Sequence, residues 1–155
     1  MKQYTFNLTL LNLIYRLRKF KDIIYDELEK AMLDNSDVVV GMIKKQLYNQ
    51  GINGNNEEIM GYAPYKPRTI KKKRRKGQPT DRVTLRDTGA FYNSMQLKRV
   101  GGGFAIVASD YKTSRLQKKY KPTILRLTNE NLNILLKSKV RPYLVRRLKV
   151  RLHED

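Results

Sequence analysis

Four carboxylates in the first 30 residues are the first group that could perform chemistry. They are Asp22, Asp26, Glu27 and Glu29, and Lys30 follows them. The order Glu27-x-Glu29-Lys30 echoes the Glu-x-Lys element of metal-dependent nucleases, in which carboxylates hold the metal ion. The segment has helical periodicity, however, and residues i and i+2 of a helix do not face each other. Because Asp26 and Lys30 form an i,i+4 pair, the sequence favours a solvated helix face over a metal site.

Other catalytic chemistry finds little support in the residue types present. The chain has no cysteine, which excludes disulfides, thiolate nucleophiles and thiolate metal sites. Its one histidine, His153, cannot supply a histidine-based metal site alone. Gly101-Gly102-Gly103 lacks the Lys-Ser or Lys-Thr pair that completes a phosphate-binding loop, so a hairpin turn is the better interpretation. The sequence therefore predicts a protein that is not an enzyme and holds no metal or cofactor.

Positive charge is the dominant feature of the composition. Lys and Arg number 33 against 14 Asp and Glu, giving a formal net charge of +19. Such a chain repels itself unless an anionic partner neutralises it, and nucleic acid is the commonest such partner. The charge alone leaves an acidic protein face or an anionic membrane open. Residues expected to contact a polyanion or partner are Lys71, Lys72, Lys73, Arg74, Arg75, Lys76, Arg115, Lys118, Lys119, Lys121, Arg146 and Arg147.

Length and hydropathy predict one domain over residues 1–155. A chain of 155 residues is long enough to bury a core without disulfides or metals. No stretch approaches 18 uninterrupted apolar residues, so we expect no transmembrane helix. The first residues lack the pattern of a signal peptide. The elements described next make up an α+β fold: a long N-terminal helix, a small antiparallel sheet with a glycine-rich hairpin, and a C-terminal helix.

The N-terminal third reads as helix. Apolar residues from Ile14 to Met32 step by three and four, which marks one helical face within a helical stretch over 10–50. The Asp-Asn-Ser sequence at 34–36 indicates a break, with Ser36 able to cap a second segment. The apolar stripe then resumes, and Gly51 is suited to end the helix.

The middle of the chain reads as irregular. Glycine and asparagine at 51–58 indicate a loop. Pro64 and Pro67 favour an extended segment over 61–70, because each disfavours helix in the residue before it. Residues 71–76 are six consecutive cations, which repel one another and usually stay solvated. The segment 71–80 is therefore expected to be a flexible basic loop.

The remaining segments predict a hairpin followed by helices. Asp87 and Thr88 can cap a short helix over 89–95. Two strands, 96–100 and 104–109, are joined by the three glycines, and the apolar second strand should be central.

After the hairpin, 111–121 is basic and reads as irregular, and 123–127 could be a further strand. Thr128 is a good cap for a helix from 129. Pro142 suits the first turn of a last helix, which should run to about 152.

Several short motifs together resemble one known family. Residues 62–73 (YAPYKPRTIKKK) precede 85–95 (LRDTGAFYNSM), a strand follows at 104–109, and RPYL stands at 141–144. In this order they resemble the phage virion morphogenesis family, which includes tail completion and head–tail joining proteins. The matching positions, interpreted as architectural rather than as a site, are Pro67, Thr69, Ile70, Leu85, Thr88, Gly89, Phe91, Ser94, Arg141, Pro142 and Tyr143.

The resemblance implies a structural virion subunit of the head–tail connector or tail terminus. Such a subunit would assemble in the bacterial host cytoplasm as a hexameric or dodecameric ring around the DNA channel. Its partners would be other virion proteins, either portal or connector subunits or tail tube subunits, and it would not bind a membrane. Sequence-independent contact with genomic DNA would account for the basic residues. The alternative is a basic nucleic-acid-binding protein, involved in packaging or associated with the ribosome.

Overall fold

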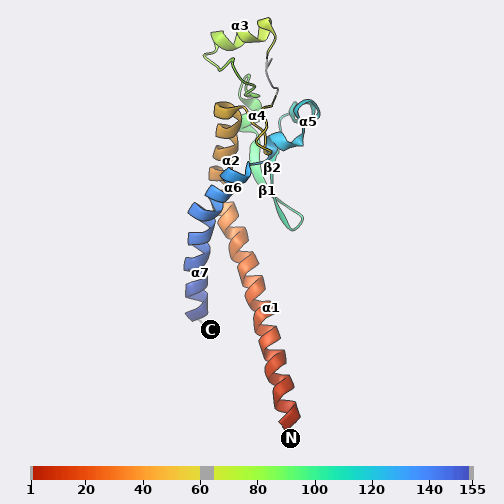
Figure 1. Ribbon diagram of the computed structural model, residues 1–155, viewed down its shortest axis with the longest axis vertical. Coiled ribbons are helices and arrows are strands. Elements are labelled where there is room, and N and C mark those ends of the chain that lie inside the picture. The colour runs from red at the N-terminus through yellow and green to blue at the C-terminus, as the bar shows by residue number, and fades with distance from the viewer. Residues whose placement is uncertain (1, 60–64, 154–155) are drawn as a thin grey trace. The chain divides into compact units, whose positions relative to one another are not determined.

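The computed structural model describes residues 2–59 and 65–153, and Figure 1 labels the elements. A long N-terminal helix, a two-stranded antiparallel sheet and a C-terminal helix confirm the expected α+β class. The chain divides into two compact units, which are described separately here. Unit 1 comprises Met1–Asp34 and Leu136–Asp155, and unit 2 comprises Asn35–Leu135. A single domain over 1–155 therefore stays a prediction.

Unit 1 is built from two long helices in contact, α1 (Lys2–Asp34) and α7 (Arg141–His153). A short π-helix, η3 (Leu136–Val140), leads directly into α7. The wider π turn lies just before α7, where the ring of Pro142 would crowd a carbonyl of the preceding turn and where Pro142 has no N–H to donate. Pro142 lies in the first turn of α7, which confirms the predicted last helix.

Three side chains of α7 bind Glu27 of α1 and hold the two helices together. Glu27 is fully buried, and its carboxylate accepts hydrogen bonds from Arg147 Nε at 3.2 Å, Arg151 Nη2 at 3.0 Å and Tyr143 OH at 3.3 Å. Lys30 Nζ lies 3.5 Å away. The expected solvated face is therefore wrong at Glu27, because this position of α1 faces the cations of α7 rather than water.

The charges around Glu27 decide its protonation state. Burial alone would raise the pKa of Glu27, but the hydrogen bond and charge of Arg147, with Lys30 and Arg151, outweigh burial and lower it. The carboxylate is thus ionised inside unit 1 at neutral pH. A buried charge is tolerated only when paired in this way.

Unit 2 holds the remaining elements around one apolar core. The core combines residues far apart in the sequence, among them Ile43, Leu47, Phe91, Met95 and Ile124. In chain order the elements are α2 (Ser36–Lys45), the π-helix η1 (Gln46–Gln50), α3 (Pro67–Arg75), α4 (Ala90–Asn93), β1 (Met95–Val100), β2 (Gly103–Ala108), α5 (Thr113–Tyr120), the 3-10 helix η2 (Pro122–Leu125) and α6 (Asn129–Leu135).

A buried amide ties the two ends of unit 2 together. Gln46 Nε2 donates to the carbonyl of Arg126 at 3.1 Å. Its Oε1 accepts from the Thr128 N–H and from Asn131 Nδ2, both at 3.0 Å. Gln46 is 1% exposed, so these bonds satisfy a side chain that would otherwise be costly to bury. This amide contact fixes the segment that begins α6 against η1.

Several expected boundaries are confirmed. The first helix breaks at Asn35, and Gly51 ends η1 with a left-handed φ of 68° that glycine adopts without strain. Strands β1 and β2 pair antiparallel from Met95↔Ala108 to Val100↔Gly103, which places the turn within the predicted glycines. The hydroxyl of Thr128 accepts from the Asn131 N–H at 3.2 Å, as a helix cap does.

Other expectations about unit 2 are wrong. Within residues 2–59 and 65–153 the sheet has two strands, so β2 has no central position there, and all its residues are partly exposed. The segment 111–121, expected to be irregular, contains α5. The strand expected at 123–127 is the 3-10 helix η2. Lys121 adopts a φ of 70° between α5 and Pro122, and the chain then enters η2.

We expect Glu27→Ala to lower the free energy of unfolding by about 1–3 kcal/mol, because it leaves the arginines of α7 without their shared acceptor. Asp26→Ala, an exposed neighbour, is the control and should change little. Thermal or urea unfolding followed by circular dichroism measures both. Because the folded pKa lies below 4.5, the Glu27 contribution is full above that pH and is lost as pH falls through the folded value. Equal stability of the two variants would contradict this role.

Candidate polyanion-binding surface

Most of the basic run lies in helix α3, which spans Pro67–Arg75. The loop expected over 71–80 is therefore wrong for 71–75, and the extended segment expected over 61–70 is wrong from Pro67 onward. Helix α3 begins with Pro67 at its first turn, a position that suits the fixed φ of proline. Lys and Arg are good helix formers once their mutual repulsion is relieved. Gly77, at a φ of 59°, lies just beyond the C-cap Lys76. The remaining question is what holds so polar a helix in place.

Lys73 docks α3 on the segment 84–86. Its Nζ donates to Gln78 Oε1 at 3.2 Å, to Thr84 Oγ1 at 3.0 Å and to the carbonyl of Arg86 at 2.9 Å. The ammonium also lies 4.8 Å from the centre of the Tyr65 ring. Only 6% of Lys73 is exposed, and burial lowers its pKa. This lysine is turned inward, although the sequence placed it among the partner-binding residues.

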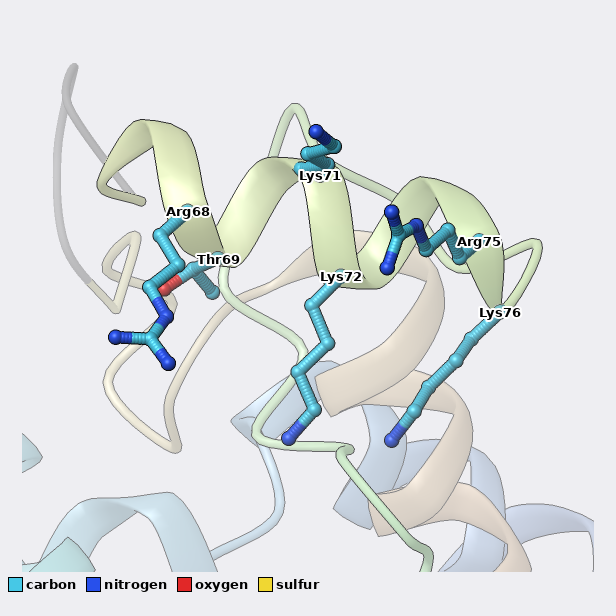
Figure 2. A pocket seen from close by; sticks show the side chains of 6 residues that line it. All are labelled: Arg68, Thr69, Lys71, Lys72, Arg75 and Lys76. Carbon is cyan, nitrogen blue, oxygen red and sulfur yellow. The ribbon is translucent and has the colours of Figure 1, made fainter.

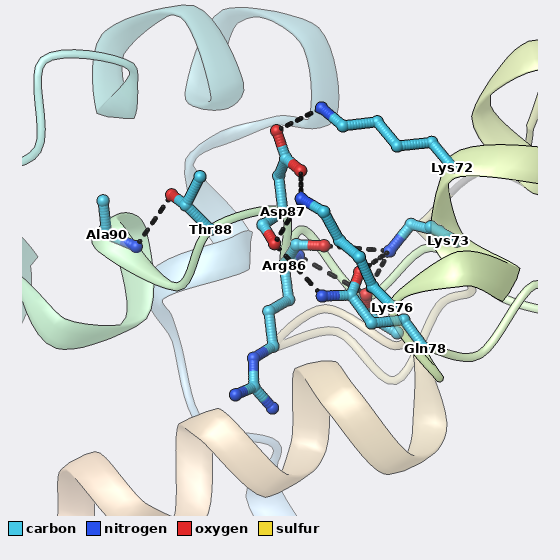
Figure 3. Close-up of polar contacts among 9 residues, drawn as sticks. Lys72, Lys73, Lys76, Gln78, Arg86, Asp87, Thr88 and Ala90 are labelled. Atoms are coloured by element: carbon cyan, nitrogen blue, oxygen red, sulfur yellow. Dashed lines mark hydrogen bonds and ion pairs between the residues drawn. The ribbon is translucent and has the colours of Figure 1, made fainter.

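Asp87 pairs with two further lysines of the same run. Its Oδ2 lies 3.0 Å from Lys72 Nζ and its Oδ1 lies 2.5 Å from Lys76 Nζ (Figure 3). The Asp87 carbonyl also accepts from Lys76 Nζ at 3.2 Å and from Gln78 Nε2 at 3.1 Å. The hydrogen bonds from Lys76 and then Lys72 lower the pKa of Asp87 to about 2. Asp87 therefore neutralises part of the basic run, and the expected cap is not made by its side chain.

The outward side of α3 forms a hollow of about 540 Å³ with cations around it (Figure 2). Figure 2 shows Lys72 and Lys76 extending in the same direction from the helix. Phosphate oxygens are the ligands that such clusters of Lys and Arg favour, without regard to base sequence. The hollow is lined by Arg68, Thr69, Lys71, Lys72, Arg75 and Lys76.

Helix α5 adds further cations beside the same part of unit 2. A cavity of about 310 Å³ is lined by Lys72 and Lys73 of α3 and by Leu116 and Tyr120 of α5. Arg115, Lys118 and Lys119 lie on α5, where Lys119 Nζ stands 4.8 Å from the Tyr120 ring centre. Lys121 Nζ lies 3.9 Å from Glu57 Oε2. The structure thus brings together the two basic stretches of unit 2 that the sequence singled out.

The remaining two predicted contact residues belong to unit 1. Arg147 binds Glu27 and is part of the fold, whereas Arg146 is exposed on α7. Within the described residues, no group of three or more His, Asp or Glu side chains could hold a metal ion. No helix within residues 2–59 and 65–153 is long and apolar enough to cross a membrane.

The family-motif residues of unit 2 support the folded chain around the basic surface. Gly89 has a φ of 97° at the N-cap of α4, a conformation that favours glycine. The Ala90 N–H donates to Thr88 Oγ1 at 3.4 Å, and Ser94 Oγ donates to the carbonyl of Phe91 at 2.9 Å. The architectural interpretation of the motif stays a prediction. The aromatic at Tyr62 lies outside the described residues.

The other motif positions fall on three segments. Pro67, Thr69 and Ile70 are in the first turns of α3. Leu85 adopts a left-handed φ of 55°. Arg141 and Pro142 begin α7, where Tyr143 contacts Glu27.

Sequence reasoning missed two residues that organise this surface. Thr84 is fully buried, its hydroxyl accepts from Lys73, and its carbonyl accepts from the Tyr92 hydroxyl. Burial raises the pKa of Tyr92 well above its usual range. The only available signal was the pattern of a small polar residue and an aromatic eight positions apart, which is too common to interpret.

We expect Lys73→Met to undock α3, because three acceptors lose their donor. The cost in unfolding free energy should be about 1–3 kcal/mol. Hydrogen–deuterium exchange should show faster exchange over 68–76 in this variant. Lys71→Met, which removes the same charge from an exposed position of α3, is the matched control and should leave that exchange unchanged. Unaltered protection in Lys73→Met would show that α3 is held by other contacts.

Comparison with protein-family models, curated proteins and solved structures finds no match to this chain. The roles of α3, Lys73 and Asp87 therefore follow from their own geometry. The resemblance in the motif segments stays an expectation about family and function.

Proposed function

We propose that this protein is a structural, non-catalytic subunit of a phage virion, placed at the head–tail connector or the tail terminus. In this proposal the outward side of α3 contacts a polyanion, either genomic DNA in the channel or an acidic face of a neighbouring ring. The observation that carries the contact is the hollow on α3 bordered by five cations. The virion role rests on the resemblance of residues 62–73 and 85–95 to that family.

The contacts of the motif segments are those expected if these segments hold the basic surface of α3 in place. Residues 84–87 accept the hydrogen bonds of Lys73, Lys72 and Lys76, and they lead directly into the Thr88-Gly89 turn. The motif residues thus hold a cationic helix outward without contributing a reactive group. A subunit that binds by charge and shape needs no more than this.

The alternative, a basic nucleic-acid-binding protein, uses the same cations. The tyrosines beside them favour it specifically: Lys119 lies over Tyr120 and Lys112 lies over Tyr111, and Tyr111 is 85% exposed. Aromatic rings beside cations can stack on unpaired bases. The two functions differ in assembly, since only the virion subunit requires a ring and a place in particles.

We expect mass spectrometry of purified phage particles to find this protein as a stoichiometric component. Native mass spectrometry of the isolated protein, with and without duplex DNA, should show a closed ring of about six or twelve copies in at least one condition. Absence from particles, together with a stable monomer that binds nucleic acid, would replace the virion proposal by its alternative.

Binding to a 20-base-pair duplex should depend on the outward side of α3. Replacing Arg68, Lys71 and Arg75 by Ala removes three cations from the hollow and leaves the contacts of Lys73 and Asp87 in place. The affinity should fall about tenfold, and the slope of log K against log salt should lose about two to three units.

The matched control replaces Lys45, Lys98 and Lys149 by Ala. These lysines are exposed and lie outside α3, and their replacement removes the same charge. Fluorescence anisotropy at several salt concentrations measures both variants. Equal loss in the two triple variants would mean that net charge, rather than α3, determines binding.

A further inference from the structure

The carboxylate of Asp87 pairs with two lysines that also border the hollow of α3. It is held by two ammonium groups, each on a different oxygen: Lys72 on Oδ2 at 3.0 Å and Lys76 on Oδ1 at 2.5 Å. Figure 3 shows both lysines reaching the carboxylate from α3. These two lysines also line the hollow of α3 in Figure 2. Two lysines that border the hollow therefore already bind one anion, supplied by the chain itself, and its carboxylate belongs to a residue that lines the neighbouring cavity of about 310 Å³.

We propose that Lys72 and Lys76 form a phosphate-binding site that Asp87 occupies in the unbound protein, and that a backbone phosphate of nucleic acid exchanges with this carboxylate. The inference rests on the proposed polyanion contact and deepens it. The site is the pair Lys72 and Lys76, the ligand class is the phosphodiester, and Asp87 is the residue that sets the affinity. A phosphodiester presents two charged oxygens, as the carboxylate does, so it can meet both ammonium groups at once.

Exposure of the pairs makes the exchange accessible. The side chain of Asp87 is 47% exposed, that of Lys72 59% and that of Lys76 34%. Ion pairs this close to water are weak, and each is expected to change an equilibrium constant by only about two- to fivefold. A phosphate of nucleic acid is flanked by other phosphates, so the strand brings more negative charge to the two lysines than the Asp87 carboxylate does. Arg68, Lys71 and Arg75 border the hollow and can meet those neighbouring phosphates.

The exchange leaves α3 docked. Lys73 holds the helix through Gln78, Thr84 and the Arg86 carbonyl, and none of these acceptors is the Asp87 carboxylate. The Asp87 carbonyl also keeps its bond from Gln78 at 3.1 Å. Lys73 docks the helix without the Asp87 carboxylate, and Lys76 Nζ also donates to the Asp87 carbonyl at 3.2 Å, so the carboxylate can leave while these backbone and Lys73 contacts remain.

The test compares Asp87→Asn with Asp81→Asn in binding a 20-base-pair duplex. Both variants gain one unit of net charge, but Asp81 pairs with its neighbour Arg82 and not with α3. Asp87→Asn should bind roughly three- to tenfold more tightly than Asp81→Asn, because phosphate no longer competes with the carboxylate. In a Lys72→Met, Lys76→Met background the advantage of Asp87→Asn should disappear. Equal affinity of the two Asn variants, or an advantage that persists without the lysines, would overturn the inference.

A measurement on the unaltered protein covers the case in which Asp87→Asn does not fold. The carboxyl ¹³C resonance of Asp87 should move when the duplex is added, and that of Asp81 should not. A stationary Asp87 resonance in the bound state would overturn the exchange. If the protein does not bind the duplex at low salt, the proposed contact with DNA fails as well. If the affinity is unchanged when Lys72 and Lys76 are replaced by Met, DNA contact stands and only this site is wrong.

A polyglutamate probe tests the ligand class. Polyglutamate presents carboxylates like the one that already occupies the site, so Asp87→Asn should improve its binding if the lysine pair accepts anions in general. A gain confined to the duplex would assign the site to phosphate.

Discussion

The folded chain depends on a small number of acceptors that hold a large excess of cations. Its charge of +19 would oppose compaction if the basic residues were merely dispersed over the surface. In unit 1 the problem is solved by one fully buried carboxylate, Glu27, which brings Arg147 and Arg151 of α7 onto α1. In unit 2 it is solved by Asp87 and by the neutral acceptors around Lys73. Each unit thus places one acid where cations from a basic helix converge.

The two solutions differ in exposure, and this difference separates structure from binding. Glu27 is inaccessible to water, so its partners cannot exchange it for an external anion without exposing a buried charge. Asp87 is half-exposed, so its lysines can change partner at little cost. The same chemical pair, carboxylate with Lys or Arg, therefore stabilises one unit and leaves the other open to ligands. Arg147 belongs to the first kind, and Lys72 and Lys76 belong to the second.

The features that could be predicted from sequence were those set by local chemistry. The hairpin follows from three consecutive glycines, the break at Asn35 from a run of polar residues, and the Thr128 cap from its hydroxyl. The helical state of α3 could not be predicted, since six adjacent cations repel one another and the acid that pairs with two of them, Asp87, lies 11 residues beyond Lys76. The burial of Glu27 depends on arginines more than 100 positions away, at 147 and 151. Likewise, nothing local distinguishes Lys73 from its neighbours, although it alone in the run is buried.

Under the proposed function, the same charge excess links assembly to binding. Copies of a chain with +19 repel one another, so a closed ring requires either acidic contact surfaces or an anion that the copies share. The acids already used inside each unit cannot serve the first purpose, because Glu27 is buried and Asp87 is paired within its own chain. A polyanion threaded through the ring, or an acidic neighbouring ring, serves the second. The anionic partner should then favour assembly of the ring. Isolated subunits should not form a closed ring before they meet that partner.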